Sequence, residues 1–205
     1  MKQPAFYIDM TACTGCKTCM VACMDGHDLP EGVVWRRVAE YAGGDWAEQP
    51  NNCFNQDVFA YYMSISCNHC ENPVCTQVCP TTAMHKQPNG IVTVDHDKCI
   101  GCRYCEWNCP YSAPQYNKII GKMTKCDFCE DRLDAGLNPL CVDACPMRAL
   151  HFGEYEELKK KIAANNHIAP LPSPALTQPC LVVKPPRNAQ PIGSTLGKIS
   201  NPEEM

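Results

Sequence analysis

The central stretch of the chain reads Cys67-x2-Cys70-x4-Cys75-x3-Cys79-Pro80 and, after a gap, Cys99-x2-Cys102-x2-Cys105-x3-Cys109-Pro110. Three cysteines spaced this closely in a looping segment can curl round one cubic metal cluster, so that their sulfurs reach three of its four corners. The fourth cysteine of each group lies about one helical turn beyond the third, and its sulfur therefore points towards a neighbouring site. The two groups form one unit, in which each group supplies the last ligand of the other.

This spacing is typical of bacterial ferredoxins with two 4Fe-4S clusters. The proline after each fourth cysteine ends a short helix and lets the chain turn. Between the two groups, residues 83–86 and 91–94 predict a β-hairpin closed by Asn89-Gly90. We expect two inner clusters, one held by Cys67, Cys70, Cys75 and Cys109 and the other by Cys79, Cys99, Cys102 and Cys105.

The same pattern occurs on either side of the central stretch. One further group is Cys13-x2-Cys16-x2-Cys19-x3-Cys23, and the last is Cys126-x2-Cys129-x11-Cys141-x3-Cys145-Pro146. Residues 6–9 before the one and residues 148–152 after the other resemble the two strands of the central hairpin, but have no local partner strand. Pairing these two strands makes an outer unit that encloses the inner one, with clusters on Cys13, Cys16, Cys19 and Cys145 and on Cys23, Cys126, Cys129 and Cys141. A sequential pairing of the groups would instead leave the central hairpin bridging two separate units.

The high cysteine content fits neither a disulfide scaffold nor a zinc ribbon. The chain has 205 residues, of which 18 are cysteine. A secreted disulfide scaffold would need a signal peptide, and the first residues contain no apolar segment of that kind. Zinc ribbons use two cysteine pairs for each ion and have no use for a triplet followed by Cys-Pro. No apolar run is long enough to span a bilayer.

The charge of the chain favours protein partners. Its formal net charge is -4, and four oxidised 4Fe-4S clusters with their thiolates would add roughly -8. We therefore expect no nucleic-acid partner. Lys17, Arg103, Lys125 and Arg148 lie in or beside the cysteine groups, where they either tune cluster potentials or are ordinary solvated surface.

Residues 24–66 are inserted between the first and second cysteine groups. Residues 33–41 and 58–66 are rich in β-branched and aromatic residues and predict two strands, joined by a loop over residues 42–57. Trp35, Trp46 and Tyr61 fit either a partner-facing surface or a small core. Cys53 here and Cys180 in the tail have no cysteine at ligand spacing, and we expect them to be free thiols.

The predicted fold class is α+β: two interleaved bacterial ferredoxin-like double-cluster units, an inserted β-hairpin and an extended Pro-rich C-terminal tail. The outer unit comprises residues 1–23 and 110–155, the hairpin residues 24–66, the inner unit residues 67–109, and the helix and tail residues 156–205. Residues 156–162 predict a short charged helix. The prolines beyond it predict a strap that is disordered or laid along a partner, and Leu181-Val182-Val183 favours the second.

A closer resemblance rests on stretches beside the cysteines, namely Glu40-Tyr-Ala-Gly-Gly-Asp-Trp46, Tyr61-Tyr-Met-Ser-Ile-Ser-Cys67-Asn-His-Cys70, Met123-Thr-Lys-Cys126 and Ala169-Pro-Leu-Pro172. With the four groups in this order, the chain resembles the iron-sulfur subunits of anaerobic dimethyl sulfoxide reductases from end to end. The cysteine pattern alone is shared by a wider family of four-cluster subunits of molybdopterin enzymes. Some of those relatives have Trp at the position of Cys102 and carry a three-iron cluster, so the presence of Cys102 predicts four 4Fe-4S clusters here.

The resemblance implies a non-catalytic electron-transfer subunit in a heterotrimer. Its partners would be a molybdopterin-containing catalytic subunit and an integral membrane anchor that oxidises menaquinol, and the complex would reduce dimethyl sulfoxide and other S- or N-oxides in anaerobic respiration. It also implies a position peripheral to the cytoplasmic membrane, on its periplasmic face. We expect no signal peptide on the chain itself, and hence export with a twin-arginine-signalled partner.

Three alternatives remain open at this point. The chain could serve another molybdopterin enzyme, such as a thiosulfate or polysulfide reductase or a formate dehydrogenase. It could be a free-standing soluble polyferredoxin, or a zinc-bound structural module. A catalytic role of its own is not expected, because the sequence contains no nucleophile elbow, phosphate loop or dinucleotide fingerprint.

Overall fold

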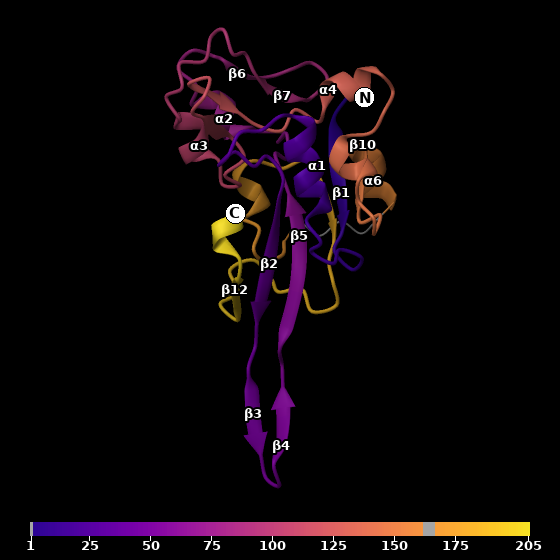
Figure 1. The fold of residues 1–205 in the computed structure, drawn as a ribbon. Coiled ribbons are helices and arrows are strands. Elements are labelled where there is room, and N and C mark those ends of the chain that lie inside the picture. Colours follow the sequence, from indigo (N-terminus) through magenta and orange to yellow (C-terminus); the bar gives the residue numbers. More distant parts are fainter. Residues whose placement is uncertain (1, 162–166) are drawn as a thin grey trace.

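The computed structural model describes residues 2–161 and 167–205, which form a body of short helices and strands with one long projecting arm (Figure 1). The helices are α1 (Thr18–Gly26), α2 (Val74–Gln77), α3 (Tyr104–Asn108), α4 (Glu130–Asp134), α5 (Leu140–Asp143) and α6 (Tyr155–Lys161), with 3-10 turns at Pro174–Leu176 and Pro202–Glu204. Within the described residues, no helix is long and apolar enough to cross a bilayer. Mixed helices and strands agree with the predicted α+β class.

The outer sheet joins segments from both ends of the sequence. Its central strand β1 (Pro4–Asp9) pairs antiparallel with β10 (Leu150–Glu154) and parallel with β11 (Leu181–Lys184). The first pairing confirms the prediction that the strand before Cys13 meets the strand after Cys145. The sequence predicted that this part of the tail is disordered or lies along a partner protein. That prediction was wrong, because β11 pairs with β1 of the same chain. Val182 and Val183 are fully buried, and β11 covers an edge of β1 that would otherwise expose unpaired backbone groups.

The inner hairpin is local in sequence. It consists of β6 (Met84–Lys86) and β7 (Val92–Val94), paired antiparallel as the Asn-Gly signal predicted. The Gln87 N–H donates to the Ile91 carbonyl at 2.7 Å and the Gly90 N–H to the Gln87 carbonyl at 2.9 Å. Gly90 has a φ of 86°, which a residue with a side chain adopts only with strain. A further hairpin, formed by β8 (Gln115–Asn117) and β9 (Lys122–Thr124), follows the inner cysteines.

The inserted segment forms a longer ribbon than the sequence suggested. Strands β2 (Arg37–Gly43) and β5 (Phe59–Ile65) pair antiparallel, and β12 (Gly197–Ile199) adds a third strand to β2. The loop predicted over residues 42–57 is instead a second strand pair, β3 (Trp46–Gln49) and β4 (Cys53–Gln56). The ribbon turns at Asn51-Asn52, both of which have positive φ. Asparagines at such positions make tight hairpin turns, so the polar composition marked a turn and not a loop.

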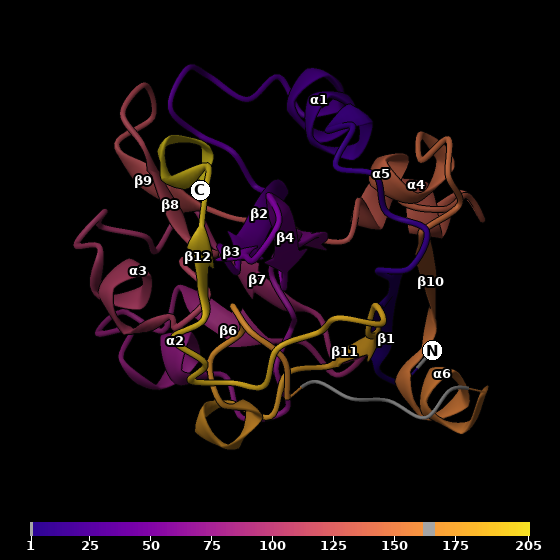
Figure 2. The same ribbon diagram turned by 90° about the horizontal axis from the view of Figure 1, so that it is seen from below.

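A cluster of buried aromatic rings lies between the inner and the outer cysteine groups. Phe128 lies 4.8 Å from Phe6 and 3.9 Å from His69, measured between ring centroids. All three rings are buried. Figure 2, which looks along the arm, shows α2 and α3 on one side of the molecule and α1, α4 and α5 on the other. The helix predicted over residues 156–162 is present as α6, although Ile162 lies outside the described residues.

Candidate iron-sulfur centres

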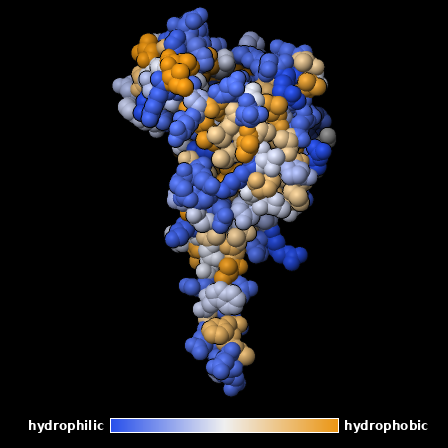
Figure 3. All heavy atoms as spheres, in the orientation of Figure 1, coloured by the Kyte–Doolittle hydropathy of each residue, from blue (hydrophilic) through white to orange (hydrophobic). Residues whose placement is uncertain are grey.

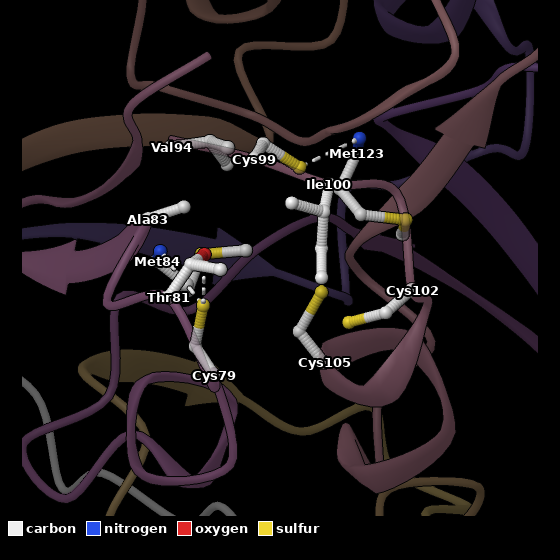
Figure 4. A pocket seen from close by; sticks show the side chains of 10 residues that line it. All are labelled: Cys79, Thr81, Ala83, Met84, Val94, Cys99, Ile100, Cys102, Cys105 and Met123. Atoms are coloured by element: carbon white, nitrogen blue, oxygen red, sulfur yellow. Dashed lines mark hydrogen bonds between the residues drawn. The ribbon is translucent and has the colours of Figure 1, made fainter. Parts of the chain in front are cut away.

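The four cysteines that we name the second inner set, Cys79, Cys99, Cys102 and Cys105, line one cavity. Figure 4 shows their sulfurs facing a common space, with Cys105 on α3 and Cys79 just beyond α2. The rest of the wall is mainly apolar and includes Met84, Ile100 and Met123. The Met84 N–H lies 3.4 Å from the Cys79 sulfur, and the Met123 N–H lies 3.4 Å from the Cys99 sulfur. Backbone donors of this kind stabilise negative charge on sulfur.

The first inner set is Cys67, Cys70, Cys75 and Cys109, and these cysteines line a second cavity. Its remaining wall includes Val92 of β7 and Tyr111. Burial raises the pKa of Cys70 to about 12. A proton therefore stays on this sulfur at neutral pH unless a metal ion displaces it.

The first outer set is Cys13, Cys16, Cys19 and Cys145, which line a third cavity together with Val38, Ser64 and Leu150. This cavity joins residues from α1, the ribbon and the outer sheet. The Ala149 N–H donates to the Cys145 sulfur at 3.3 Å, and the Ser64 hydroxyl lies 3.2 Å from the Cys19 sulfur.

The second outer set is Cys23, Cys126, Cys129 and Cys141. Helix α1, which carries Cys23, packs against α5, which carries Cys141. Burial raises the pKa of Cys23 above its ordinary value, and the nearby charges of Cys126, Cys141 and Cys129 raise it further. The same two effects place the pKa of Cys129 at about 12. The packing of α1 against α5 therefore brings two of the cysteine groups together at this set.

The loops that carry the cysteines repeat in their backbone conformation. Gly15 and Gly101 stand at equivalent places in the two short groups, and both have positive φ. A side chain on Gly15 would clash with the Tyr62 ring, and one on Gly101 would clash with the Gly121 carbonyl oxygen. The long groups place His69 and Phe128 at equivalent positions, and these two rings stack on each other. His69 accepts the Val92 N–H at 3.0 Å, and burial holds its pKa well below the ordinary value.

Among the residues that the structure describes, three cations are buried between the four sets. Arg36 is 1% exposed, and Arg37 and Lys125 are also buried. The Arg36 guanidinium donates to the Ser64 hydroxyl at 3.1 Å and to the Ser66 hydroxyl at 2.9 Å. Lys125 donates to the carbonyls of Val92 and Cys126. Burial alone would lower the pKa of Arg36, but the charges of Cys141, Cys19, Cys126 and Cys23 raise it above its ordinary value.

The donor chemistry of these sites fits iron-sulfur clusters. Three cavities each receive four cysteine sulfurs, which is the ligand set of a 4Fe-4S cluster. In each set three sulfurs come from one cysteine group and the fourth comes from another. The surrounding buried cations and backbone donors offset the negative charge that such a site would carry.

The comparisons with known proteins agree with this chemistry. Residues 58–155 match the family model of the 4Fe-4S dicluster domain. The protein is 56% identical over 203 residues to the B subunit of anaerobic dimethyl sulfoxide reductase from Escherichia coli K12, a match that covers 99% of this sequence and 98% of the relative. It is 54% identical to the corresponding subunit from Haemophilus influenzae, over 100% of both sequences.

This protein belongs to the family of anaerobic dimethyl sulfoxide reductase B subunits.

A relative named for another reductase is less similar to this protein. The thiosulfate reductase electron transfer subunit PhsB of Salmonella typhi is 43% identical over 150 residues, which cover 73% of this sequence and 74% of the relative. The match to the 4Fe-4S dicluster domain and the full-length similarity to the B subunits together show that the protein carries 4Fe-4S clusters, as the sequence predicted.

The other cysteines and the basic residues singled out in the sequence lie in different places in the structure. Cys53 is exposed at the arm, and Cys180 is buried in a small apolar cluster with Ala5 and Val182. Lys17 pairs with Glu204, and Arg103 with Glu106, at the surface. Lys125 is the exception among the basic residues, because it is buried between cysteine sets. His27 is not among the residues singled out in the sequence, and its Nε2 lies 3.2 Å from the Cys129 sulfur.

The sequence reasoning missed Arg36 and Arg37. Arg36 precedes β2 and Arg37 begins it, inside a segment whose composition predicts an apolar strand. Two adjacent charges in such a segment were the available signal, because arginine is seldom fully buried without a partner. The three aromatic residues of the insertion lie in three different environments. Tyr61 lies in the core and donates to the Ala169 carbonyl at 2.8 Å, Trp35 donates to the Thr124 hydroxyl at 3.1 Å, and Trp46 is exposed.

Proposed function

We propose that the protein relays electrons through four 4Fe-4S clusters, one on each cysteine set, in two interleaved ferredoxin-like units. When bound, such a cluster takes up and releases one electron at a time. The observation that carries the proposal is the gathering of cysteines from distant groups into common cavities, above all Cys145 with Cys13 and Cys109 with Cys67. The proposed unit boundaries are those predicted from the sequence.

The contacts between sets support a linear order. Helix α1 carries both Cys19 of the first outer set and Cys23 of the second. The His69 ring, next to Cys70 of the first inner set, stacks 3.9 Å from the Phe128 ring, next to Cys129 of the second outer set, and so links these two sets. Helices α2 and α3, which contact each other, link the two inner sets. The proposed order is first outer, second outer, first inner and second inner set.

The surface at one end of this order supports a direction. Large apolar side chains near the second inner set are exposed, among them Trp107 at 69% and Ile119 at 79%. Figure 3 shows apolar atoms breaking the hydrophilic surface of the lobe that contains α2 and α3. Exposed apolar patches mark interaction sites. We propose that this end meets an integral membrane anchor that oxidises menaquinol, and that the first outer set faces a molybdopterin catalytic subunit.

The proposed complex is a heterotrimer that reduces dimethyl sulfoxide and other S- or N-oxides, at the periplasmic face of the cytoplasmic membrane. Support for this substrate class is the full-length similarity to B subunits of anaerobic dimethyl sulfoxide reductases. The similarity to PhsB is lower and covers less of the sequence. Identification of the catalytic subunit that co-purifies with this protein separates the two reductases.

The functional test uses Cys102→Ser at the proposed anchor end. The change removes one ligand, and a potential shift of about 120 mV would alter the one-electron equilibrium about a hundredfold. We expect the complex to assemble and to reduce sulfoxide from an artificial donor that feeds the catalytic subunit, but to fail with a quinol analogue. Cys180→Ser, at a cysteine outside the four sets, is the matched control and should retain both activities. Loss of both activities in Cys102→Ser would indicate an assembly role, and unimpaired quinol activity would place this cluster off the path.

A further inference from the structure

Arg36 occupies a special place between the two outer cysteine sets. It is the largest of the fully buried side chains in the described part of the molecule. Its guanidinium donates to Ser64, whose hydroxyl lies 3.2 Å from the Cys19 sulfur of the first outer set. Its guanidinium also lies over the Phe6 ring, which packs 4.8 Å from Phe128, the residue before Cys129 of the second outer set. Burial raises the pKa of Cys141 in the same set, and the positive charge of Arg36 partly offsets this effect. The guanidinium therefore interacts with both sets.

The environment of Arg36 holds this charge in place. Ser64 and Ser66 accept its hydrogen bonds, and its guanidinium carbon lies 4.2 Å from the centroid of the Phe6 ring. Among these contacts there is no carboxylate to neutralise it. A buried cation without such a partner is unfavourable, and the negative charge of two cluster sites is what offsets it.

We infer that Arg36 is a positioning residue for the electron-transfer reaction, whose fixed charge raises the reduction potentials of both outer clusters together. The inference rests on the proposed function. Reduction adds one negative charge to a cluster, and a nearby buried cation stabilises that charge most strongly where water is excluded. The second inner set lacks an equivalent among the three buried cations described above. Arg36 thereby favours electrons on the outer pair over the second inner cluster.

The test is a redox titration of the full complex followed by electron paramagnetic resonance, with the neutral variant Arg36→Gln. We expect the ratio of reduced to oxidised outer clusters at a fixed potential to fall at least about tenfold, which corresponds to about 59 mV for one electron. The two inner clusters should change much less. Arg36→Lys keeps the charge and should keep the outer potentials close to those of the unchanged protein.

Arg37→Gln is the matched control. Arg37 is the next residue, is also buried, and donates to the Tyr111 carbonyl at 2.6 Å. Burial lowers its pKa, and the charge of Cys109 in the first inner set opposes this effect. Its loss should therefore affect the first inner cluster and spare the outer pair. Equal shifts from Arg36→Gln and Arg36→Lys, or outer shifts of the same size from Arg37→Gln, would overturn the inference. So would failure of both Arg36 variants to assemble, because that result marks a purely structural residue.

The arm carries a second inference, independent of the first. We propose that β3, β4 and their turn dock into a groove on the catalytic subunit that is apolar at its centre and basic at its rim. The proposal deepens the proposed function and rests on it. Residues directly opposite each other in an antiparallel pair share a face. The register Trp46↔Gln56 and Glu48↔Phe54 therefore places Trp46 and Phe54 on one face of the arm.

Both aromatic side chains face solvent on the isolated protein, with Trp46 at 65% and Phe54 at 57% exposure. Figure 1 shows the arm extending well beyond the body, and Figure 3 shows pale and apolar side chains between blue ones along it. A two-stranded hairpin with nothing packed on it is marginally stable in water. Exposed aromatic residues on such an element are typical of interface anchors.

The negative charge of the arm indicates which kind of partner surface it can bind. Residues 44–58 contain Asp45, Glu48 and Asp57 but no lysine, arginine or histidine. Two copies of the arm would repel each other, and an anionic lipid surface would repel it as well. The arm also points away from the lobe that contains α2 and α3, the proposed anchor end (Figure 1). A basic groove on the catalytic subunit is complementary to it.

The test measures the affinity of the full-length protein for the catalytic subunit, after confirming unchanged iron content. We expect Trp46→Ala with Phe54→Ala to raise Kd at least about tenfold, since buried interface aromatics often contribute more than about 1.4 kcal/mol each. Gln49→Ala with Asn55→Ala alters the opposite face of the same arm and should leave Kd nearly unchanged. High salt should weaken binding of the unchanged protein.

Three results would overturn the arm proposal. They are an unaltered Kd in the aromatic double variant, equal losses in both double variants, and a dimer of this protein that the aromatic variant converts to monomer. If the unchanged protein fails to bind any molybdopterin subunit, the proposed function fails and not the arm proposal alone.

Discussion

The outer sheet and the inner hairpin serve the same cysteine pattern in different ways. The hairpin pairs Met84 with Val94 across a short local turn, whereas the outer sheet pairs Pro4 with Glu154 and then adds β11. The outer sets are buried except at Cys13 and Cys16, while the inner sets reach the surface at most of their cysteines. Arg36 lies between the outer sets.

This difference shows that the strand pair beside the cysteine groups can form between neighbouring segments or between segments far apart in the sequence. The inner hairpin needs only the closure of a short turn, so its ordering is cheap in chain entropy. The outer sheet must bring together three segments that are far apart in the sequence, residues 4–9, 150–154 and 181–184. Its cost is offset by complete burial of Val182, Val183 and their neighbours. The two regions should therefore respond differently to damage.

The largest expected effect comes from removing a cysteine that joins distant groups. In Cys145→Ser we expect loss or conversion of the cluster held by Cys13, Cys16 and Cys19, with the inner clusters intact. Cys109→Ser should damage the first inner cluster in the same way. Electron paramagnetic resonance with iron and sulfide analysis measures both, and Cys180→Ser is the control. A structure in which Cys23 shares a cluster with Cys13 would refute the proposed sets.

A smaller effect is expected from breaking the outer sheet without touching a cysteine set. Val183→Asp places a carboxylate where the native side chain is fully buried, and we expect it to destabilise the fold by at least about 3 kcal/mol. The outer clusters should be lost preferentially, so that about half of the iron remains. Asn188→Asp, which adds a carboxylate at an exposed position just beyond β11, is the control. Uniform loss of all four clusters would show that the two regions fold as one unit.

The smallest effect concerns the point where the inner hairpin touches the start of β1. Gly90 has positive φ, and a side chain there would meet Gln3 at 2.5 Å and the Lys2 carbonyl at 2.9 Å. Gly90→Ala should therefore lower the free energy of unfolding by about 1–2 kcal/mol. Gly136→Ala is the matched control, because Gly136 also has positive φ but nothing within 4 Å of the added carbon. Thermal loss of cluster absorbance compares the two variants, and equal losses would mean that this contact contributes nothing.

Much of the candidate site could be read from the sequence because its signals are local. Cysteine spacing, Gly15, Gly101 and the Asn-Gly turn each follow from the reach of a few residues of backbone. The pairing of β1 with β10 was also predictable, since the repeat left two strands without partners. The Asn51-Asn52 turn was missed because its residues are equally common in loops.

The sequence by itself determined the cysteine pattern, the internal repeat and the α+β class, since these depend on residue type and spacing. Only the tertiary structure decided which charges are buried, where the tail goes and how far the arm extends. Arg36, Arg37 and Lys125 look like surface residues when read singly, and β11 looks like part of a Pro-rich strap. Their burial depends on contacts between residues far apart in the chain, and no local pattern records such contacts.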